Sequence, residues 1–346
     1  MSGKRAENYK PINRPRRILI SRSDGIGDVV LTLPLAGALK RRFPDCRVSF
    51  LGRRYTEALI RACRSVDEFW DWEALRLLSR EQQAALLAEG RFDAVVHVFP
   101  RKEIAAAAKQ AGIPLRIGTS HRWFHWLTCN KLVHFSRRNS NQHEAQLNFR
   151  LLQPFGIFAD LSLAQIADLY DLGVKTPPEY LRIMDGRRLN LILHPASRGS
   201  AKEWGIENWA QLIAALPQDK FRLFLTGSEE EGRAVRPSLV APFSHVTDMT
   251  GKLDLAGLMG FIAAADALLA CSTGPLHLAA ALGKCAVGLY ASRRPIHPGR
   301  WAPIGKHVIV LEDGLKDRYS GPISISVQKV IETLLSLSEK KSRSGV

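Results

Sequence analysis

Asp28 is the first residue whose type and setting could do chemistry. It follows Gly25 and Gly27 in SRSDGIGDVV, residues 21–30, where a strand-like run enters a glycine turn and a helix-like run leaves it. Such turns often cradle phosphate, but Val30 stands where a dinucleotide fingerprint needs its third glycine, and two carboxylates, Asp24 and Asp28, would repel a phosphate. A carboxylate there can instead accept a proton from a substrate hydroxyl. The alternative, that Asp28 only stabilises the start of the helix, remains open.

A second polar stretch, HPASRGSAKEW, covers residues 194–204 and follows a predicted strand. Its small hydroxyl and basic side chains are Ser197, Arg198, Ser200 and Lys202. Hydroxyls beside a lysine and an arginine at the carboxyl end of a strand suit a diphosphate. The alternative is a solvated basic loop flanked by two core tryptophans, Trp204 and Trp209.

The third stretch, CSTGPLHLAAALG, covers residues 271–283. A buried strand runs into Ser272, Thr273 and Gly274, and Pro275 is predicted at the first helical position, where it leaves the other N–H groups of that turn free. Those groups and the Thr273 hydroxyl would form an anion site. His277 lies in the same first turn and could reach the ligand, although a lone histidine there is more often structural.

Three glutamates open the next helical run, in LTGSEEEGRA at residues 225–234. An acidic residue at such a place often binds ribose hydroxyls, and Glu229 is the first of the three. The alternative is favourable pairing of acidic side chains with the helix dipole.

Alternating apolar runs and helical patterns indicate an α/β chain with parallel sheets. Strands are predicted at 18–21, 48–52, 94–99, 115–118, 191–194, 222–226, 267–270 and 286–290. Helices are predicted at 29–42, 56–62, 80–89, 103–111, 143–152, 208–215, 229–239, 255–265, 275–282 and 323–337. The pattern predicts two Rossmann-like domains, 1–165 and 166–325, followed by a C-terminal helix with a disordered basic tail over 326–346. Ligands would bind outside the carboxyl ends of the strands, in a cleft between the domains.

Charge and cysteine usage narrow the possible partners and compartment. The chain has 346 residues and a net charge of +16, of which residues 1–160 carry +12 from 27 basic and 15 acidic side chains. This basic half favours a polyanionic partner, namely nucleic acid, an anionic membrane face or a phosphorylated substrate, with a merely solvated surface as the alternative. Five scattered cysteines and the absence of an apolar secretion signal predict reduced thiols in the cytoplasm. No run is long enough to span a membrane.

Together these stretches resemble the ADP-heptose:lipopolysaccharide heptosyltransferase family, inverting glycosyltransferases of the GT-B fold. The residues that carry the resemblance are SDGIGDVVLTLP, HEAQLNFRLLQPFGI, HPASRGSAKEW, LTGSEEE and STGPLHLAAALGK. The resemblance covers the chain from about Arg17 to about Tyr290. It implies two Rossmann-like domains facing a cleft, with the acceptor bound by 1–165 and the nucleotide sugar by 166–325.

The resemblance also implies roles for individual residues. Asp28 would be the general base on the acceptor hydroxyl, and the glycine turn at Gly25 and Gly27 would belong to the acceptor side. The implied donor contacts are Ser197 and Lys202 at the diphosphate, Glu229 at the ribose, the main chain of Lys252 and Leu253 at the adenine, and Thr273, Gly274 and His277 at the phosphates and sugar. Ser272 stands where many relatives carry aspartate, which leaves the donor sugar open.

The resulting prediction is transfer of L-glycero-D-manno-heptose from ADP-heptose to a lipopolysaccharide core acceptor, with Asp28 as base and Lys202 stabilising the leaving diphosphate. No metal is expected, because the C-terminal half has no carboxylate pair of the DxD kind. Candidate acceptor contacts are Arg53, Arg54, Arg101, Lys102, Arg116 and Arg122. The aromatic run Trp123, Phe124 and Trp126 could touch an anionic inner-membrane surface, with core packing of at least one of the three as the alternative. A peripheral cytoplasmic enzyme is expected. The alternatives are another nucleotide-sugar-dependent GT-B glycosyltransferase and, remotely, a basic nucleic-acid-binding protein, for which no reading motif is present.

Overall fold

The computed structural model describes residues 14–137, 140–158, 160–197, 199, 201–315 and 321–343. The chain divides into two compact units. The first contains the chain up to Asp24, then Thr32–Ser140 and Glu144–Ser162. The second contains Gly25–Leu31, Asn141–His143 and the chain from Leu163 onward. The glycine turn with Asp28 therefore packs with the second unit, although it follows the first strand of the first.

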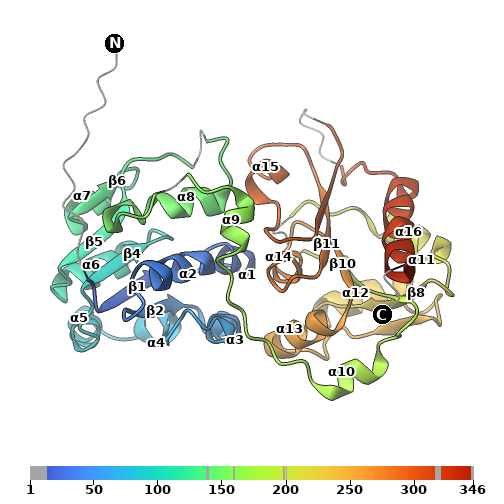
Figure 1. Ribbon diagram of the computed structural model, residues 1–346, viewed down its shortest axis with the longest axis horizontal. Helices are drawn as coiled ribbons and strands as arrows, with labels where there is room; N and C mark the ends of the chain where they lie inside the picture. Colours follow the sequence, from blue (N-terminus) through green and yellow to red (C-terminus); the bar gives the residue numbers. More distant parts are fainter. Residues whose placement is uncertain are drawn as a thin grey trace, which may run out of the picture. The chain divides into compact units, whose positions relative to one another are not determined.

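Each unit is built on one six-stranded parallel sheet (Figure 1). The first sheet contains β1 (Arg17–Ser21), β2 (Arg47–Gly52), β3 (Glu68–Asp71), β4 (Ala94–His97), β5 (Leu115–Thr119) and β6 (Lys131–Val133), in the order β3-β2-β1-β4-β5-β6. The second contains β7 (Leu189–His194), β8 (Phe221–Leu225), β9 (Val246–Asp248), β10 (Ala267–Cys271), β11 (Cys285–Tyr290) and β12 (Val308–Glu312), in the order β12-β11-β10-β7-β8-β9. Read from its own first strand, the second sheet repeats the order of the first.

Helices connect these strands. Those of the first half of the chain are α1 (Ile26–Val30), α2 (Leu33–Arg42), α3 (Glu57–Ala62), α4 (Trp72–Leu75), α5 (Arg80–Glu89), α6 (Lys102–Gln110), α7 (Trp123–Thr128) and α8 (Glu144–Arg150). The others are α9 (Leu163–Ala167), α10 (Pro178–Ile183), α11 (Ile206–Ala215), α12 (Glu229–Leu239), α13 (Leu255–Ala264), α14 (Gly274–Ala281), α15 (Pro298–Trp301) and α16 (Val327–Arg343). Two short 3₁₀ turns are η1 (Arg54–Thr56) and η2 (Gln153–Phe155).

The strand order reverses between β1 and β4 in the first sheet and between β7 and β10 in the second. Doubly wound sheets bind their ligands at such reversals, outside the carboxyl ends of the strands, because the loops there turn to opposite faces and leave a crevice. Two parallel sheets of this order confirm the predicted α/β fold of the GT-B type.

The predicted strands correspond to the four inner strands of each sheet, and the prediction misses all four edge strands: β3, β6, β9 and β12. Three of these are short, with the sequences EFWD, KLV and VTD, and lack the continuous apolar run of a strand buried on both faces. The fourth, VIVLE, has such a run, so its signal was present in the sequence.

Two predicted helices differ from the structure by more than two residues at an end. The run predicted at 29–42 begins earlier and is split into α1 and α2, because Pro34 lies in the first turn of α2 and lacks the N–H that a continuous helix would need. The helix predicted at 323–337 is α16, which starts at Val327 and continues through Arg343. The tail predicted to be disordered is KKSRSGV, residues 340–346, and its first four residues are therefore helical. Residues 344–346 lie outside the described part of the chain.

Helix α16 belongs to the core of the second unit and lies beside α11 (Figure 1). Its Val330 and Leu334 are fully buried in the same apolar cluster as Trp204 and Trp209. The two indoles pack edge to face with centroids 5.2 Å apart, and Trp204 Nε1 donates to the carbonyl oxygen of Ile325 at 2.7 Å. Both tryptophans are thus core residues, as the alternative interpretation of their stretch expected.

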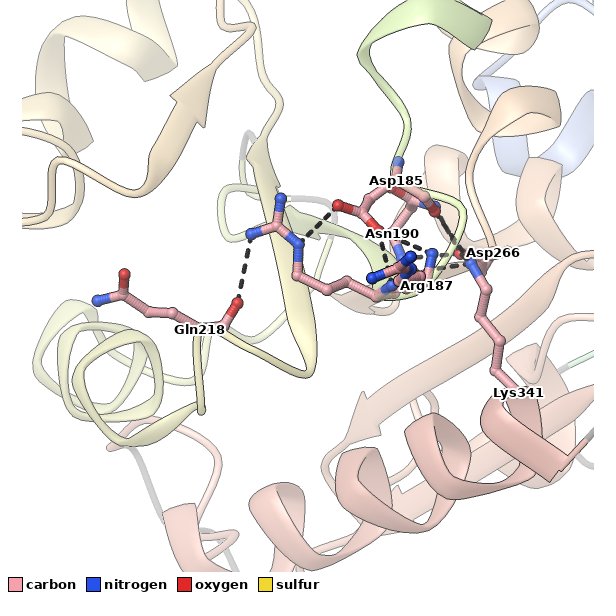
Figure 2. Close-up of polar contacts among 7 residues, drawn as sticks. Asp185, Arg187, Asn190, Gln218, Asp266 and Lys341 are labelled. Carbon is pink, nitrogen blue, oxygen red and sulfur yellow. Dashed lines mark hydrogen bonds and ion pairs between the residues drawn. The ribbon is translucent and has the colours of Figure 1, made fainter. Parts of the chain in front are cut away.

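The end of α16 is tied to the amino-terminal edge of the second sheet (Figure 2). Lys341 Nζ lies 2.6 Å from a carboxylate oxygen of Asp266 and 2.8 Å from the carbonyl oxygen of Arg188. The same Asp266 oxygen accepts hydrogen bonds from the main-chain N–H and the side-chain amide of Asn190, at 2.7 and 2.8 Å. Hydrogen bonds from the N–H groups of Arg188 and Arg187 hold the pKa of Asp185 below its ordinary value.

We expect Lys341→Ala to lower the free energy of unfolding by about 1–2 kcal/mol, because the Asp266 carboxylate loses a charged donor and keeps only amide partners. Urea denaturation of the variant and of wild type measures the difference. Lys340→Ala, a truncation of the exposed neighbouring lysine, is the control and should change the unfolding free energy by less than half as much. Equal effects of the two substitutions would show that the contact in Figure 2 does not stabilise the unit.

Candidate active site

The amino-terminus of α14 is the most developed anion site among the described residues. Strand β10 ends at Cys271, and α14 begins at Gly274, one residue before the predicted start, with Pro275 at its second position. Thr273 precedes the helix but does not cap it with its side chain, and its Oγ1 is buried without a hydrogen-bond partner within the described chain. A hydroxyl in that state, beside free helix N–H groups, is suited to an anionic ligand.

His277 lies one turn into the same helix and is buried. Its Nδ1 likewise has no hydrogen-bond partner in the part of the chain that the structure describes. Burial lowers the pKa of His277 from 6.5 to about 3, and His143 acts in the same direction. The imidazole is therefore neutral at physiological pH, so it can hydrogen-bond a ligand but cannot contribute a positive charge.

The loop after β7 contains the second predicted donor stretch. Ser197 is buried, and both its N–H and its hydroxyl lie within 3.0 Å of one carboxylate oxygen of Glu203. Lys202 is half-buried in the same loop. The Ser197 hydroxyl is thus used in hydrogen bonds within its own loop. Glu203 is a structural partner that the sequence prediction missed. Arg198 and Ser200 lie outside the described residues.

The sheet brings these two stretches to the same edge. Strand β10 pairs in parallel with β7, with Ala270 opposite His194. The loop carrying Ser197 and Lys202 and the start of α14 therefore leave neighbouring strands at their carboxyl ends, at the reversal of strand order. This is the position that the fold favours for a ligand, and it joins residues about 75 positions apart in the sequence.

The glycine turn of Asp28 contacts this same site, within the second unit. A Cβ placed on Gly27 would lie 3.0 Å from Cδ2 of His277 and 3.7 Å from the Cα of Gly274. A Cβ on Gly274 would lie 2.9 Å from the Cβ of Ile26. Helices α1 and α14 therefore approach with almost no side chain between them, which explains why both positions are glycine.

Asp28 occupies the third position of α1, one residue after Gly27. Gly25 is the N-cap residue, so Asp28 lies inside the first turn of the helix. A favourable interaction of its carboxylate with the helix dipole remains compatible with this position. The structure thus places the residue directly before Asp28 against the histidine and glycine of the α14 anion site.

Gly27→Ala tests this close approach. The added methyl would meet the His277 ring at 3.0 Å, so α1 or the imidazole must move, and we expect kcat/KM to fall by about 10- to 100-fold. Steady-state kinetics of donor turnover measure the effect. Gly186→Ala is the matched control, because a Cβ there meets nothing within 4 Å. Equal activity of the two variants would mean that the approach of α1 to α14 is unimportant for turnover.

Asp24, the other carboxylate of the turn, has a structural partner in the first unit. Its Oδ1 lies 2.7 Å from Nε of Arg22, whose side chain is 3% exposed. A guanidinium nitrogen of Arg22 also lies 3.5 Å from the buried carboxylate of Glu144, which accepts a 2.8 Å hydrogen bond from Arg137. Asp24 thus belongs to a buried ion cluster. Arg22 and Glu144 were missed as partners, although Glu144 lies in the HEAQ motif.

Glu229 and the segment around Lys252 come together, as the predicted nucleoside site requires. The N–H of Gly251 donates to the carbonyl oxygen of Gly227, and a Cβ on Gly251 would collide with the Glu229 carboxylate. Both Glu229 oxygens accept hydrogen bonds from Arg236, at 2.8 and 2.7 Å, and this pairing lowers the pKa of Glu229. Ser228 and Glu231 form the capping box of α12. Leu253 follows in the same segment. Arg236 is a further residue that the prediction missed.

The predicted acceptor arginines are divided among local contacts in the first unit. Arg53 pairs with Glu73 at 3.0 Å, and Arg54 pairs with Asp71 at 2.8 Å. Arg101 donates to the hydroxyl and carbonyl oxygen of Ser23 at 2.5 and 3.1 Å, directly after β1. The Arg116 guanidinium donates to the main-chain carbonyls of Thr128 and Ile113, so its charge is used within the fold. Lys102 and Arg122 are exposed.

His97 is buried at the carboxyl end of β4, beside the reversal of strand order in the first sheet. Neither of its ring nitrogens has a hydrogen-bond partner in the described residues. Burial lowers the pKa of His97 from 6.5 to about 3, with smaller contributions from His125 and Arg116. Because its pKa is lower in the folded protein, protonation favours the unfolded chain, and stability is lost as pH falls below 6.5.

His97→Gln removes this linkage. Relative to the variant, wild type should lose about 1.4 kcal/mol of unfolding free energy for each pH unit between 6.5 and the lowered pKa. Denaturant titrations at pH 7.5, 5.5 and 4.5 measure the difference between the two proteins. His134→Gln, at an exposed histidine, is the control for the same chemical change. Parallel pH curves for wild type and His97→Gln would contradict the assignment of a neutral buried imidazole.

Two absences hold for the described residues. They contain no group of three or more His, Cys, Asp or Glu side chains placed to hold a metal ion. Within the same residues, no helix combines the length and apolar character needed to cross a membrane.

Comparison with known proteins gives a family match. The model of glycosyltransferase family 9 (heptosyltransferase) matches residues 82–319. The lipopolysaccharide heptosyltransferase 1 of Escherichia coli is 25% identical over 337 residues, covering 93% of this chain and 100% of that protein. The lipopolysaccharide core heptosyltransferase OpsX of Haemophilus influenzae is 21% identical over 323 residues, covering 90% and 89%.

A solved structure agrees in fold. The E. coli ADP-heptose lipopolysaccharide heptosyltransferase II superposes with a TM-score of 0.74 at 20% identity, covering 94% of this chain and 99% of that one. At this identity the likeness shows a shared fold.

Proposed function

Because the chain belongs to glycosyltransferase family 9, the heptosyltransferases, we propose that it transfers L-glycero-D-manno-heptose from ADP-heptose to a sugar of a lipopolysaccharide core. The anomeric configuration inverts in this reaction. The acceptor is bound through the basic first unit. The enzyme is cytoplasmic, attaches peripherally to an anionic inner-membrane surface, and needs no metal.

One observation carries the proposal: Asp28 stands one residue from the contact between Gly27 and the imidazole of His277, at the start of α14. The helix that carries Asp28 therefore packs against the helix whose start is the proposed anion site, which supports a base and a diphosphate site close to one another. Direct displacement at an anomeric carbon that carries a diphosphate needs both: a base for the incoming hydroxyl and a positive environment for the leaving group.

Each residue of the proposed site has one role in the reaction. The Asp28 carboxylate accepts the proton of the acceptor hydroxyl while its oxygen bonds to the anomeric carbon. The bond from that carbon to the diphosphate oxygen breaks with its electron pair, so negative charge grows on ADP. Lys202, the N–H groups at the start of α14 and the Thr273 hydroxyl stabilise this charge, and neutral His277 hydrogen-bonds the phosphates or sugar. Glu229 binds the ribose, and the main chain of Lys252 and Leu253 binds the adenine.

Product analysis tests the proposal. The protein is incubated with ADP-heptose and a panel of truncated core acceptors, and product masses are read, with NMR of the new linkage for inversion. We expect one acceptor to gain a single heptose with release of ADP, and chelation of metals with EDTA to leave the rate unchanged. Release of ADP without a heptosylated product, or no turnover with any acceptor, would contradict heptosyl transfer.

Ser272 favours a second candidate, transfer of a different sugar from a nucleotide-sugar donor by the same mechanism. It stands directly before the Thr273–Gly274 pair and carries no charge. A neutral hydroxyl binds sugar hydroxyls more weakly than a carboxylate would. Calorimetry with ADP-heptose, UDP-sugars and GDP-sugars separates the candidates by the donor that binds tightest.

A further inference from the structure

Helix α7 in the first unit presents its apolar side chains outward. Trp123, Trp126 and Leu127 have the i, i+3, i+4 spacing of one helix face, and their exposed fractions are 65%, 65% and 64%. His125, a polar residue, is the buried one. An ordinary surface helix has the opposite arrangement, with apolar residues inward. We call Trp123, Trp126 and Leu127 the aromatic surface.

The aromatic surface is held in place by contacts along its edges. Trp126 Nε1 donates to the carbonyl oxygen of Ser120 at 2.8 Å, so the polar end of the indole is satisfied by the protein. Lys102 Nζ lies 5.2 Å from the centroid of the Trp123 ring. Lys109 Nζ donates to the carbonyl oxygen of Leu127 at 2.9 Å. The rings therefore stay presented to solvent, and two lysines of α6 border them.

The stretch of chain that carries the aromatic surface is basic. Residues 104–143 contain no Asp or Glu, and six Lys or Arg residues: Lys109, Arg116, Lys131, Arg122, Arg137 and Arg138. Arg122, immediately before Trp123, is exposed, as are Lys102 and Lys109. Tryptophan prefers the interface between lipid head groups and acyl chains, and lysine and arginine are attracted to anionic head groups. An exposed apolar helix face inside a basic rim is complementary to an anionic bilayer.

We propose that the aromatic surface docks the protein on an anionic lipid bilayer, with Trp123, Trp126 and Leu127 entering the interface and Lys102, Lys109 and Arg122 contacting lipid phosphates. This inference rests on the proposed function in one respect: the proposed acceptor is carried by a membrane. The docking itself depends on α7 and α6.

Vesicle flotation tests the docking. Wild type should float with vesicles of phosphatidylcholine containing phosphatidylglycerol, more weakly at high salt, and remain in solution with phosphatidylcholine alone. The double variant Trp123→Ser/Trp126→Ser should lower the partition coefficient at least about tenfold, because binding scales with the apolar area inserted. Leu77→Ser is the matched control: Leu77 is 82% exposed in the same unit but lies outside the aromatic surface. It should float like wild type.

Three results would overturn the docking proposal: undiminished flotation of the double variant, equal loss in Leu77→Ser, or concentration-dependent dimers of wild type that the double variant abolishes. The last would assign the aromatic surface to a second copy of the chain. Thermal melting first verifies that the exposed substitutions leave the fold intact.

Activity separates failure of docking from failure of the proposed function. The double variant should turn over a short water-soluble acceptor at the wild-type rate, but lose at least about tenfold in rate with the acceptor embedded in anionic vesicles. If neither protein glycosylates either acceptor, heptosyl transfer is wrong while flotation still decides the docking. If both proteins use the embedded acceptor equally well, the docking surface is wrong while the transfer stands.

Discussion

Asp28→Asn is expected to lower the turnover number by about 10²- to 10⁴-fold, the usual loss when a general base is removed. The amide keeps the shape of the carboxylate and cannot accept the proton of the acceptor hydroxyl. Donor binding, measured by calorimetry with ADP, should stay close to wild type, because the proposed donor contacts come from α14 and the loop after β7. The effect should therefore appear in kcat and leave the affinity for ADP unchanged.

The matched control for Asp28 is Glu179→Gln. Glu179 is an exposed carboxylate in the first turn of another short helix of the second unit, α10, so it shares the dipole environment without the contact to α14. It should turn over at the wild-type rate. Normal turnover in Asp28→Asn would remove Asp28 from the mechanism and leave it as a helix-stabilising residue. A large loss of stability in place of turnover would lead to the same conclusion.

Lys202→Ala is expected to lower kcat by about 10²- to 10³-fold, comparable to removing one preorganised donor from a developing charge. The lysine would contact the diphosphate as it leaves, where negative charge is greatest. ADP affinity should also fall, which distinguishes this variant from Asp28→Asn. Steady-state kinetics and ADP calorimetry give the two quantities.

Lys220→Ala controls for the loss of one positive charge. Lys220 is exposed directly before β8, at the amino-terminal edge of the second sheet, whereas Lys202 follows the carboxyl end of β7. Its removal should change neither kcat nor ADP affinity. If both lysine variants lose activity alike, the effect comes from the net charge of the protein and Lys202 has no specific contact with the diphosphate.

The sequence predicts the inner strands well because they are buried on both faces. Runs such as Leu191–His194 and Ala267–Ala270 are continuous and apolar, and the register of β10 on β7 follows once both strands are known. Edge strands such as β6 and β9 are three residues long. Their positions depend on pairing with a neighbour, which leaves little pattern in the strand itself.

In the site, too, residues that follow one another in the chain could be predicted, whereas contacts between residues far apart in the sequence could not. The residues at the start of α14 are recognisable because strand, glycine, proline and histidine follow one another in the chain. The family resemblance, which the match to residues 82–319 confirms, adds the other motifs. Pairing of Arg22 with Glu144 or of Glu229 with Arg236 joins residues whose types are common at any surface. Neither local pattern nor motif predicts such partners, since only the folded chain brings them together.

The tryptophans include a buried pair in the second unit and an exposed pair in the first. Trp204 and Trp209 are sealed in the core of the second unit, next to the loop of Lys202, and should emit at short wavelength and resist iodide. Trp123 and Trp126 in the first unit are open to water and should emit at longer wavelength and be quenched readily. Among the described tryptophans only these two are exposed, so the long-wavelength, readily quenched emission can report a lipid arriving at α7.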